Sequence, residues 1–474
     1  ARRGSTASRR WGAISDPDRT DGGADAGDRA ESDDDSVAVD GGETAGADST
    51  ATDSDRTERV AAATGHGLAA YLRDHAVHGA VILGFLLYPL VYGALLETPA
   101  APFAEAFLPA VTFMVVVLYM GLFAMSFDFV SGYTGYLSFG HAAFFGTGGY
   151  FVVLAANGQV PGVPGGTPFM ITLVLGAALA GLLAVVIGSV SFRLTGVYFA
   201  MITLGFAQVI YELIRSWGYV STNPTEGATV SGDALAIGVP YVDALSLDVG
   251  RLTGESFENL LGLGIDLSAT VVSYYALGIV VVVCYFAMQR ILHSPFGRVM
   301  IAIRENEERA RAVGYPTYRF KLAAFAISGF FGAIAGGIFA AYSRSVAPDG
   351  TFYFLVTADA LITTIIGGFG TLAGPVYGTL FTQGLEDVLS TESGGIATLL
   401  REELPASVYE AELFGVSPEL FVNTAVDGRA PLYLGIIFVL FVLFVPNGIL
   451  GTLRDRLGGT VGKRLPDHLR RYFR

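Results

Sequence analysis

Ten mostly apolar stretches follow one another along the chain, and most of the charges lie in the segments between them. They cover residues 80–96, 107–130, 137–156, 168–191, 197–214, 269–289, 322–342, 356–369, 374–389 and 431–446. About 20 apolar residues make one transmembrane helix, so the pattern predicts an all-α integral membrane protein with about ten transmembrane helices. The eighth and ninth stretches are short and interrupted by glycine, which leaves open whether each spans the membrane fully.

The arginine and lysine residues predict which side of the membrane each segment faces. Seven of them lie within residues 290–321 and seven within the C-terminal tail, 452–474. Basic segments stay in the cytoplasm. Four apolar stretches separate the two basic segments, and an even number of spans puts both on the same side of the membrane. Residues 217–268 hold only Arg251 against seven carboxylates, and we expect them, with the acidic segment 390–430, to be external. Both termini are then cytoplasmic.

The composition and charge of the chain add four points. Residues 1–60 are acidic and lack the apolar content for a core, so we expect a disordered tail ahead of a membrane domain over 77–451. The formal net charge is −14, and only two residues, Lys321 and Lys463, are lysines, which favours a halophilic source. A single cysteine, Cys284, excludes an internal disulfide. No basic patch for nucleic acid is visible.

Two glycine-broken segments resemble each other across the chain. Gly132-Tyr-Thr-Gly-Tyr-Leu-Ser138 and Gly367-Gly-Phe-Gly-Thr-Leu-Ala373 share the pattern Gly-x-x-Gly-x-Leu-small. Corresponding broken segments in two halves mark the substrate path of internally repeated transporters. The second segment therefore offers Gly367, Gly368 and Gly370 as candidates for the translocation path, although glycine is common enough in membrane helices for a chance similarity.

The basic segment 290–321 carries signals for two short helices. Ser294 suits an N-cap with Pro295 at the first helical position, and Asn306 suits a second N-cap. Gly314 suits the C-terminal cap. The favourable i,i+4 pairs are Glu305–Arg309 and Glu307–Arg311, whereas Glu308 faces Ala312. Two capped helices would form a rigid cytoplasmic knob that transmits force from a soluble partner; the alternative is a solvated loop that only fixes topology.

Two motifs within the apolar stretches hold further candidates for the translocation path. They are Ser138, Phe139 and His141 in one motif, and Thr203 and Gln208 in another. An ionisable residue in a span usually faces protein or water, yet His141 also suits a neutral packing role. Thr203 and Gln208 suit weak contacts to a zwitterion, or hydrogen bonds between helices. Asp128 and Asp359 lie near predicted span ends, where water is close.

Several motifs together resemble the LivM-type branched-chain amino acid permeases. The run from Glu308 to Gly314 is similar to the Glu-Ala-Ala-x-x-x-Gly coupling loop of ABC importer permeases, with Ala310 also matching. The wider resemblance, over 107–451, rests on the runs 135–146, 196–208, 294–321, 366–375 and 446–451. The acidic tail, the long segment 390–430 and the loose match over 225–240 depart from the family, which puts substrate specificity in doubt.

The resemblance implies the permease subunit of an ABC importer in the cell membrane. Its implied partners are a homologous permease subunit, two cytoplasmic ATPase subunits and an extracellular substrate-binding protein. Arg304, Glu305, Glu308, Ala310 and Gly314 would form the ATPase-coupling loop. The sequence holds no Gly-x-x-x-x-Gly-Lys-[Ser/Thr] loop, so ATP would be hydrolysed by another chain. We expect no catalytic residue, cofactor or metal site here.

Other functions remain as alternatives. The same machinery could carry urea or short amides instead of branched-chain amino acids. An ion-coupled secondary transporter or channel would need carboxylates deep in the bundle, and the sequence places Asp128, Glu212 and Asp359 at the periphery. A membrane enzyme is the weakest interpretation, because no acid–base or nucleophile constellation appears.

Overall fold

The computed structural model describes residues 76–99, 107–165, 167–221, 223–230, 236–237, 247–248, 268–388, 430–445 and 448–452, together with Ala101 and Ala104. The predicted tail 1–60, all but the first residue of the tail 452–474, all but the last residue of the segment 390–430 and most of 217–268 lie outside these residues. The described residues therefore belong almost entirely to the membrane domain.

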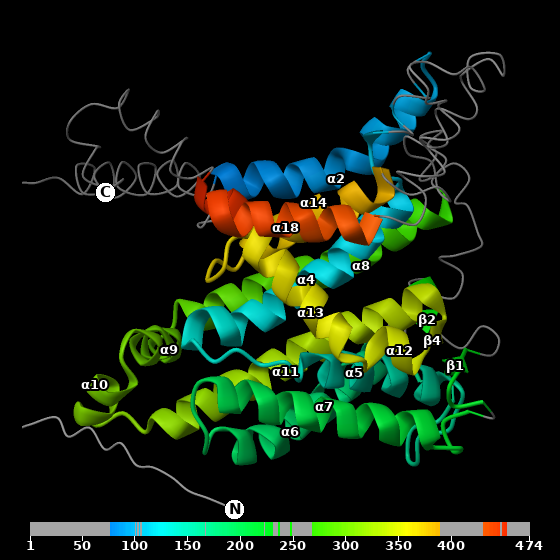
Figure 1. Cartoon of the computed structure of the whole chain (residues 1–474). Helices are drawn as coiled ribbons and strands as arrows, with labels where there is room; N and C mark the ends of the chain where they lie inside the picture. The colour runs from blue at the N-terminus through cyan, green and yellow to red at the C-terminus, as the bar shows by residue number, and fades with distance from the viewer. Residues whose placement is uncertain are drawn as a thin grey trace, which may run out of the picture. The chain divides into compact units, whose positions relative to one another are not determined.

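Each of the ten predicted apolar stretches contains a helix in the described part of the chain (Figure 1). The helices are α2 (Ala76–Leu96), α4 (Val111–Thr134), α5 (His141–Ala156), α6 (Phe169–Ser191), α7 (Val197–Ser216), α8 (Ala269–Leu292), α11 (Thr317–Ser343), α13 (Phe354–Gly367), α14 (Gly374–Val388) and α18 (Ala430–Phe444). Within the described residues, six helical segments have the length and composition to cross a membrane, among them Pro348–Gly367, which joins α13 to the short α12 (Pro348–Thr351). The helices are thus found where expected, but about ten full spans are not confirmed.

The predicted boundaries are wrong where glycine or proline sets the helix end. The stretch 137–156 begins its helix only at His141, because α4 ends at the left-handed Gly135 (φ 78°) and a non-helical connection comes next. α11 begins at Thr317, five residues before the predicted 322, directly after Pro316. Proline suits the position before or at the first helical turn, where no backbone N–H is needed.

The core lies around α11 and α4. α11 packs against α5, α6 and α4, and α14 packs against α4 and α13. α5 and α11 approach at glycines: a Cβ atom at Gly148 would clash with the backbone of Ala333, and one at Gly336 with the backbone of Phe145. Small residues let membrane helices approach to backbone contact. The same applies between α13 and α14, where Gly367, Gly374 and Gly378 meet.

The two ends of α11 carry different structures. Before its first residue lie α9 (Pro295–Glu305) and α10 (Glu307–Ala312), the two helices predicted for the basic segment. Beyond its last residue, β4 (Ser345–Val346) pairs antiparallel with β1 (Ala228–Thr229), and β2 (Ala236–Ile237) pairs with β3 (Leu247–Asp248). A helix of 27 residues is about 40 Å long. The described part of 217–230 and the segment 290–316 therefore lie at opposite ends of the bundle (Figure 1).

Candidate functional site

The predicted helix caps of the basic segment are confirmed. Ser294 Oγ accepts a hydrogen bond from the backbone N–H of Gly297 at 3.5 Å, with Pro295 as the first helical residue. Asn306 Oδ1 accepts from the backbone N–H of Arg309 at 2.8 Å. Gly314 comes after α10 with φ 94°, the left-handed conformation that glycine adopts without strain. The two helices α9 and α10 are therefore defined by local sequence signals.

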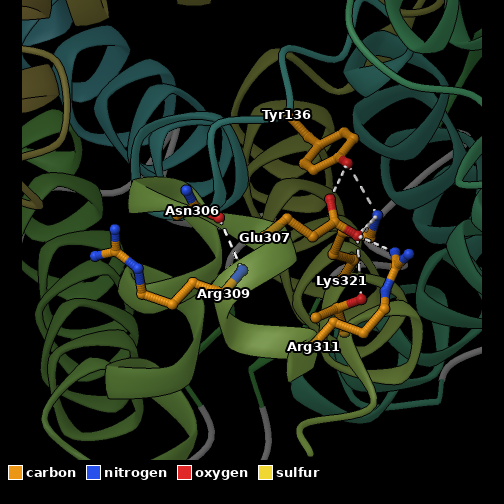
Figure 2. Close-up of polar contacts among 7 residues, drawn as sticks. Tyr136, Asn306, Glu307, Arg309, Arg311 and Lys321 are labelled. Carbon is orange, nitrogen blue, oxygen red and sulfur yellow. Dashed lines mark hydrogen bonds and ion pairs between the residues drawn. The ribbon is translucent and has the colours of Figure 1, made fainter. Parts of the chain in front are cut away.

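Glu307 fastens α10 to the helix bundle (Figure 2). Its Oε1 accepts hydrogen bonds from Lys321 Nζ at 2.7 Å, Arg311 Nη2 at 3.1 Å and Thr317 Oγ1 at 3.1 Å. Its Oε2 accepts from the hydroxyl of Tyr136 at 2.5 Å. Partial burial acts to raise the pKa of the Glu307 carboxyl, but the bonds from Lys321 and Tyr136 outweigh it and hold that pKa below its usual value. The carboxylate is therefore ionised at neutral pH.

Lys321 is the buried centre of this cluster. Its side chain is 4% exposed and its Nζ lies 2.9 Å from the Tyr136 hydroxyl oxygen. The same Nζ lies 4.4 Å from the centre of the Tyr136 ring and 5.6 Å from that of Phe192, within the range of cation–π attraction. The cluster ties α10, α11 and the connection between α4 and α5 into one unit. The sequence alone paired Glu307 only with Arg311. The rarity of lysine in this chain was a signal that could have singled out Lys321 as a second partner.

The other face of α10 carries different residues. Ala310 is buried against Val299, Ile303 and Phe320. Glu308 is exposed, and no ion pair holds it among the described residues. The expected pair between Glu305 and Arg309 does not form within the described part of the chain; both residues are exposed. The exposed side of the knob therefore offers Glu305 and Glu308 to another molecule.

Arg304 points from α9 toward the glycine-broken segments. Its Nη1 donates a hydrogen bond to the backbone oxygen of Gly132 at 2.5 Å. Gly370 lies against the Arg304 side chain, and Gly367 packs against α14. The structure thus joins the predicted coupling residue Arg304 to the predicted glycine motif, which the sequence treated as separate features.

The motif Ser138–His141 meets Thr203 at the start of α5. The backbone N–H of Phe139 donates to Thr203 Oγ1 at 3.2 Å, and that of Gly140 to Ser138 Oγ at 3.2 Å. One further N–H of the first helical turn, that of Ala142, donates to Thr357 Oγ1 at 2.8 Å. The first N–H groups of a helix have no partner within it. Around the start of α5, the hydroxyl groups of Thr203 on α7 and Thr357 on α13 accept hydrogen bonds from backbone N–H groups. Ser138 and Thr203 are fully buried.

His141 is held by one hydrogen bond and by aromatic rings. Ser328 Oγ donates to the backbone oxygen of Ser126 at 2.5 Å, so it accepts from His141 Nε2 at 2.7 Å. Three phenylalanines meet the imidazole edge to face, namely Phe127, Phe144 and Phe325. Gln208 lies apart, farther along α7, and its buried Oε1 has no hydrogen-bond partner in the described part of the chain.

Two carboxylates lie elsewhere than the sequence suggested. Asp128 is fully buried in α4, where its Oδ1 accepts a hydrogen bond from the backbone N–H of Gly370 at 2.8 Å. Asp359 lies midway along the apolar segment Pro348–Gly367 and is exposed on this chain. Asp128 does lie near the end of α4, but the expectation of nearby water is wrong for it, because the fold brings a second segment over that end. The predicted position near a span end is wrong for Asp359, which lies in the middle of its segment.

Comparison with known proteins identifies relatives among transport permeases. The family model described as the permease component of branched-chain amino acid transport systems matches residues 110–402. The chain is 31% identical over 265 residues to the high-affinity branched-chain amino acid transport system permease protein LivM of Escherichia coli, a match covering 55% of this chain and 57% of that protein. The chain thus spans little more than half the length of this relative.

Two further relatives differ in what their names say they carry. The probable branched-chain amino acid transport permease protein LivM of Methanocaldococcus jannaschii is 24% identical over 302 residues, covering 56% of this chain and 77% of that protein. The ribose import permease protein RbsC of Haemophilus influenzae is 31% identical over 135 residues, covering 26% of this chain and 42% of that protein. No solved structure matches the chain.

Proposed function

This chain belongs to the family of permease components of branched-chain amino acid transport systems, and on that premise we propose that it is the membrane-spanning subunit of an ABC importer. It would carry branched-chain or related hydrophobic amino acids across the cell membrane. Its partners would be a homologous permease subunit, two cytoplasmic ATPase subunits and an external substrate-binding protein. The longer matches, which are to amino acid permeases rather than to the ribose permease, support this substrate class.

The observation that carries the proposal is the fastening of the α9–α10 knob to the bundle. An importer driven by separate ATPases needs a rigid element that receives their movement and passes it to the membrane helices. α10 meets this requirement, because Glu307 connects it to α11 through Lys321 and to the α4–α5 connection through Tyr136. The knob's exposed side, with Glu308, is left for the ATPase. The cytoplasmic position of the knob and of both termini is part of the proposal.

For the candidate residues of the translocation path we propose local structural roles. Ser138, Phe139 and Thr203 are hydrogen-bonded within this chain, which supports a function in holding the start of α5. Gly367, Gly368 and Gly370 connect α13 to α14, and their permissive backbone suits a segment that moves during transport.

The test is reconstitution of the chain with its partner subunits in liposomes. Loaded binding protein outside and ATP inside should drive leucine uptake and raise ATP hydrolysis above its basal rate. Urea and ribose, each with a binding protein that recognises it, serve as competing substrates. Uptake that depends on an ion gradient without ATP would refute the importer and support an ion-coupled transporter. Uptake of urea but not leucine would retain the importer and change its substrate.

A further inference from the structure

The two glycine-broken segments lie against each other at the end of the bundle that carries α9. A Cβ atom placed on Gly132 would lie 2.9 Å from the Cα of Gly370. Gly135 and Gly370, which occupy equivalent places in the two motifs, both have left-handed backbones, with φ of 78° and 79°. The hydroxyl of Tyr133 accepts a hydrogen bond from the backbone N–H of Leu372 at 2.9 Å. The end of α4 is therefore locked to the connection between α13 and α14.

One side chain of α9 contacts both segments. Besides its bond to the Gly132 oxygen, Arg304 fits against both left-handed glycines. A Cβ atom on Gly135 would lie 3.5 Å from Arg304 Cγ, and one on Gly370 would lie 2.7 Å from Arg304 Nη1. The glycine at position 370 is needed for its left-handed backbone and also because the guanidinium group occupies the space of a side chain.

A buried carboxylate also holds Gly370. Asp128 is fully buried, its Oδ1 accepts the Gly370 N–H, and its Oδ2 has no hydrogen-bond partner among the described residues. A buried carboxylate with an unpaired oxygen is costly. An apolar residue would pack at this place at lower cost but would leave the Gly370 N–H unpaired. Asp128 therefore stabilises one defined position of the α13–α14 connection, which Arg304 also contacts.

We propose that Asp128 and Arg304 are positioning residues that make the α13–α14 hairpin follow α9. Asp128 holds Gly370 to α4, and Arg304 ties the same junction to the knob, so a displacement of α9 alters the contacts on Gly370 directly. Hydrogen bonds to backbone groups are directional, which lets such a junction have separate arrangements instead of sliding continuously. The inference rests on the proposed function, since it concerns how ATPase movement reaches the membrane helices.

The experiment measures leucine imported per ATP hydrolysed by the reconstituted complex. Arg304→Met keeps the apolar stem and removes the donors, Arg304→Lys restores one donor and the charge, and Asp128→Leu keeps about the size of the side chain and removes the acceptor of the Gly370 N–H. Arg298→Met is the matched control, because Arg298 is exposed on the same helix and its side chain makes no hydrogen bond or ion pair among the described residues. The ratio should fall about tenfold in Arg304→Met, the factor expected for one hydrogen bond to a charged group. It should fall similarly in Asp128→Leu, recover partly in Arg304→Lys and stay unchanged in Arg298→Met.

The outcomes separate this inference from the proposed function. If the residues only stabilise the fold, the variants yield less assembled complex but the wild-type ratio of leucine to ATP, and the inference is wrong. If Asp128→Leu fails to assemble, Arg304→Met decides, since the side chain of Arg304 lies at the surface end of the junction. If the unmodified complex itself imports no substrate with ATP, the proposed function fails and the inference falls with it.

Discussion

The ion pair between Glu307 and Lys321 should contribute measurably to stability, unlike the surface charges around it. A surface ion pair contributes about 0–1 kcal/mol, whereas breaking a buried pair costs about 3–5 kcal/mol because one charge remains buried without a partner. The Lys321 side chain is 4% exposed and that of Glu307 is 20% exposed. We therefore expect Glu307→Gln to cost about 2 kcal/mol, somewhat less than a fully buried pair.

Glu308→Gln is the matched control, because Glu308 is the next residue on the same helix and is exposed. It should change the free energy of unfolding by less than about 0.5 kcal/mol. The assay is unfolding of the purified chain in mixed micelles with increasing SDS, monitored by helical circular dichroism. The double variant Glu307→Gln with Lys321→Met should recover part of the loss, because no unpaired charge is then buried. Equal effects of Glu307→Gln and Glu308→Gln would refute the reasoning.

Three further predictions concern coupling, topology and pH. Glu308→Ala and Gly314→Val should insert normally but lose substrate-stimulated ATP hydrolysis, while Glu305→Ala is milder; stimulation at the wild-type level in the first two would make the loop a topological anchor only. Single cysteines at positions 240, 410 and 465 in a Cys284→Ala background should be labelled from outside at the first two positions and from inside at the third; inside labelling at 240 would overturn the predicted topology. Folding lowers the pKa of Glu307, so its stabilising contribution is present above the unfolded pKa of about 4.3 and is lost as pH falls through the lower folded value. The stability of Glu307→Gln should therefore lack this acid-dependent loss. An acid unfolding profile of Glu307→Gln identical to that of the unmodified chain would contradict the prediction.

The helices were predictable because apolar length and local caps determine them. A run of apolar residues forms a helix in lipid or in a bundle, since its backbone groups must be paired internally. The caps at Ser294 and Asn306 act over three residues, so the sequence alone locates them. Helix ends set by a left-handed glycine were harder, because Leu137 and Phe139 extend the apolar stretch ahead of the helix that begins at His141.

The contacts at the site were not predictable from local spacing. Glu307 meets Lys321 across 14 residues and Tyr136 across 171, distances at which helical periodicity carries no information. Asp128 and Gly370 are 242 residues apart, and only the packing of α14 on α4 brings them together. The similarity of the two glycine segments did indicate a shared role, but not that they touch.

The position of Asp359 bears on how the chain is synthesised. A charged group at the centre of a membrane helix costs about 2.5–3.5 kcal/mol during insertion by the translocon. Asp359 lies at the middle of the segment Pro348–Gly367, so this segment enters the bilayer less readily than its neighbours. Its hairpin partner α14, which packs closely on α13, emerges within a few residues and helps to retain it. Stable insertion of this segment should therefore depend on its packing against α14.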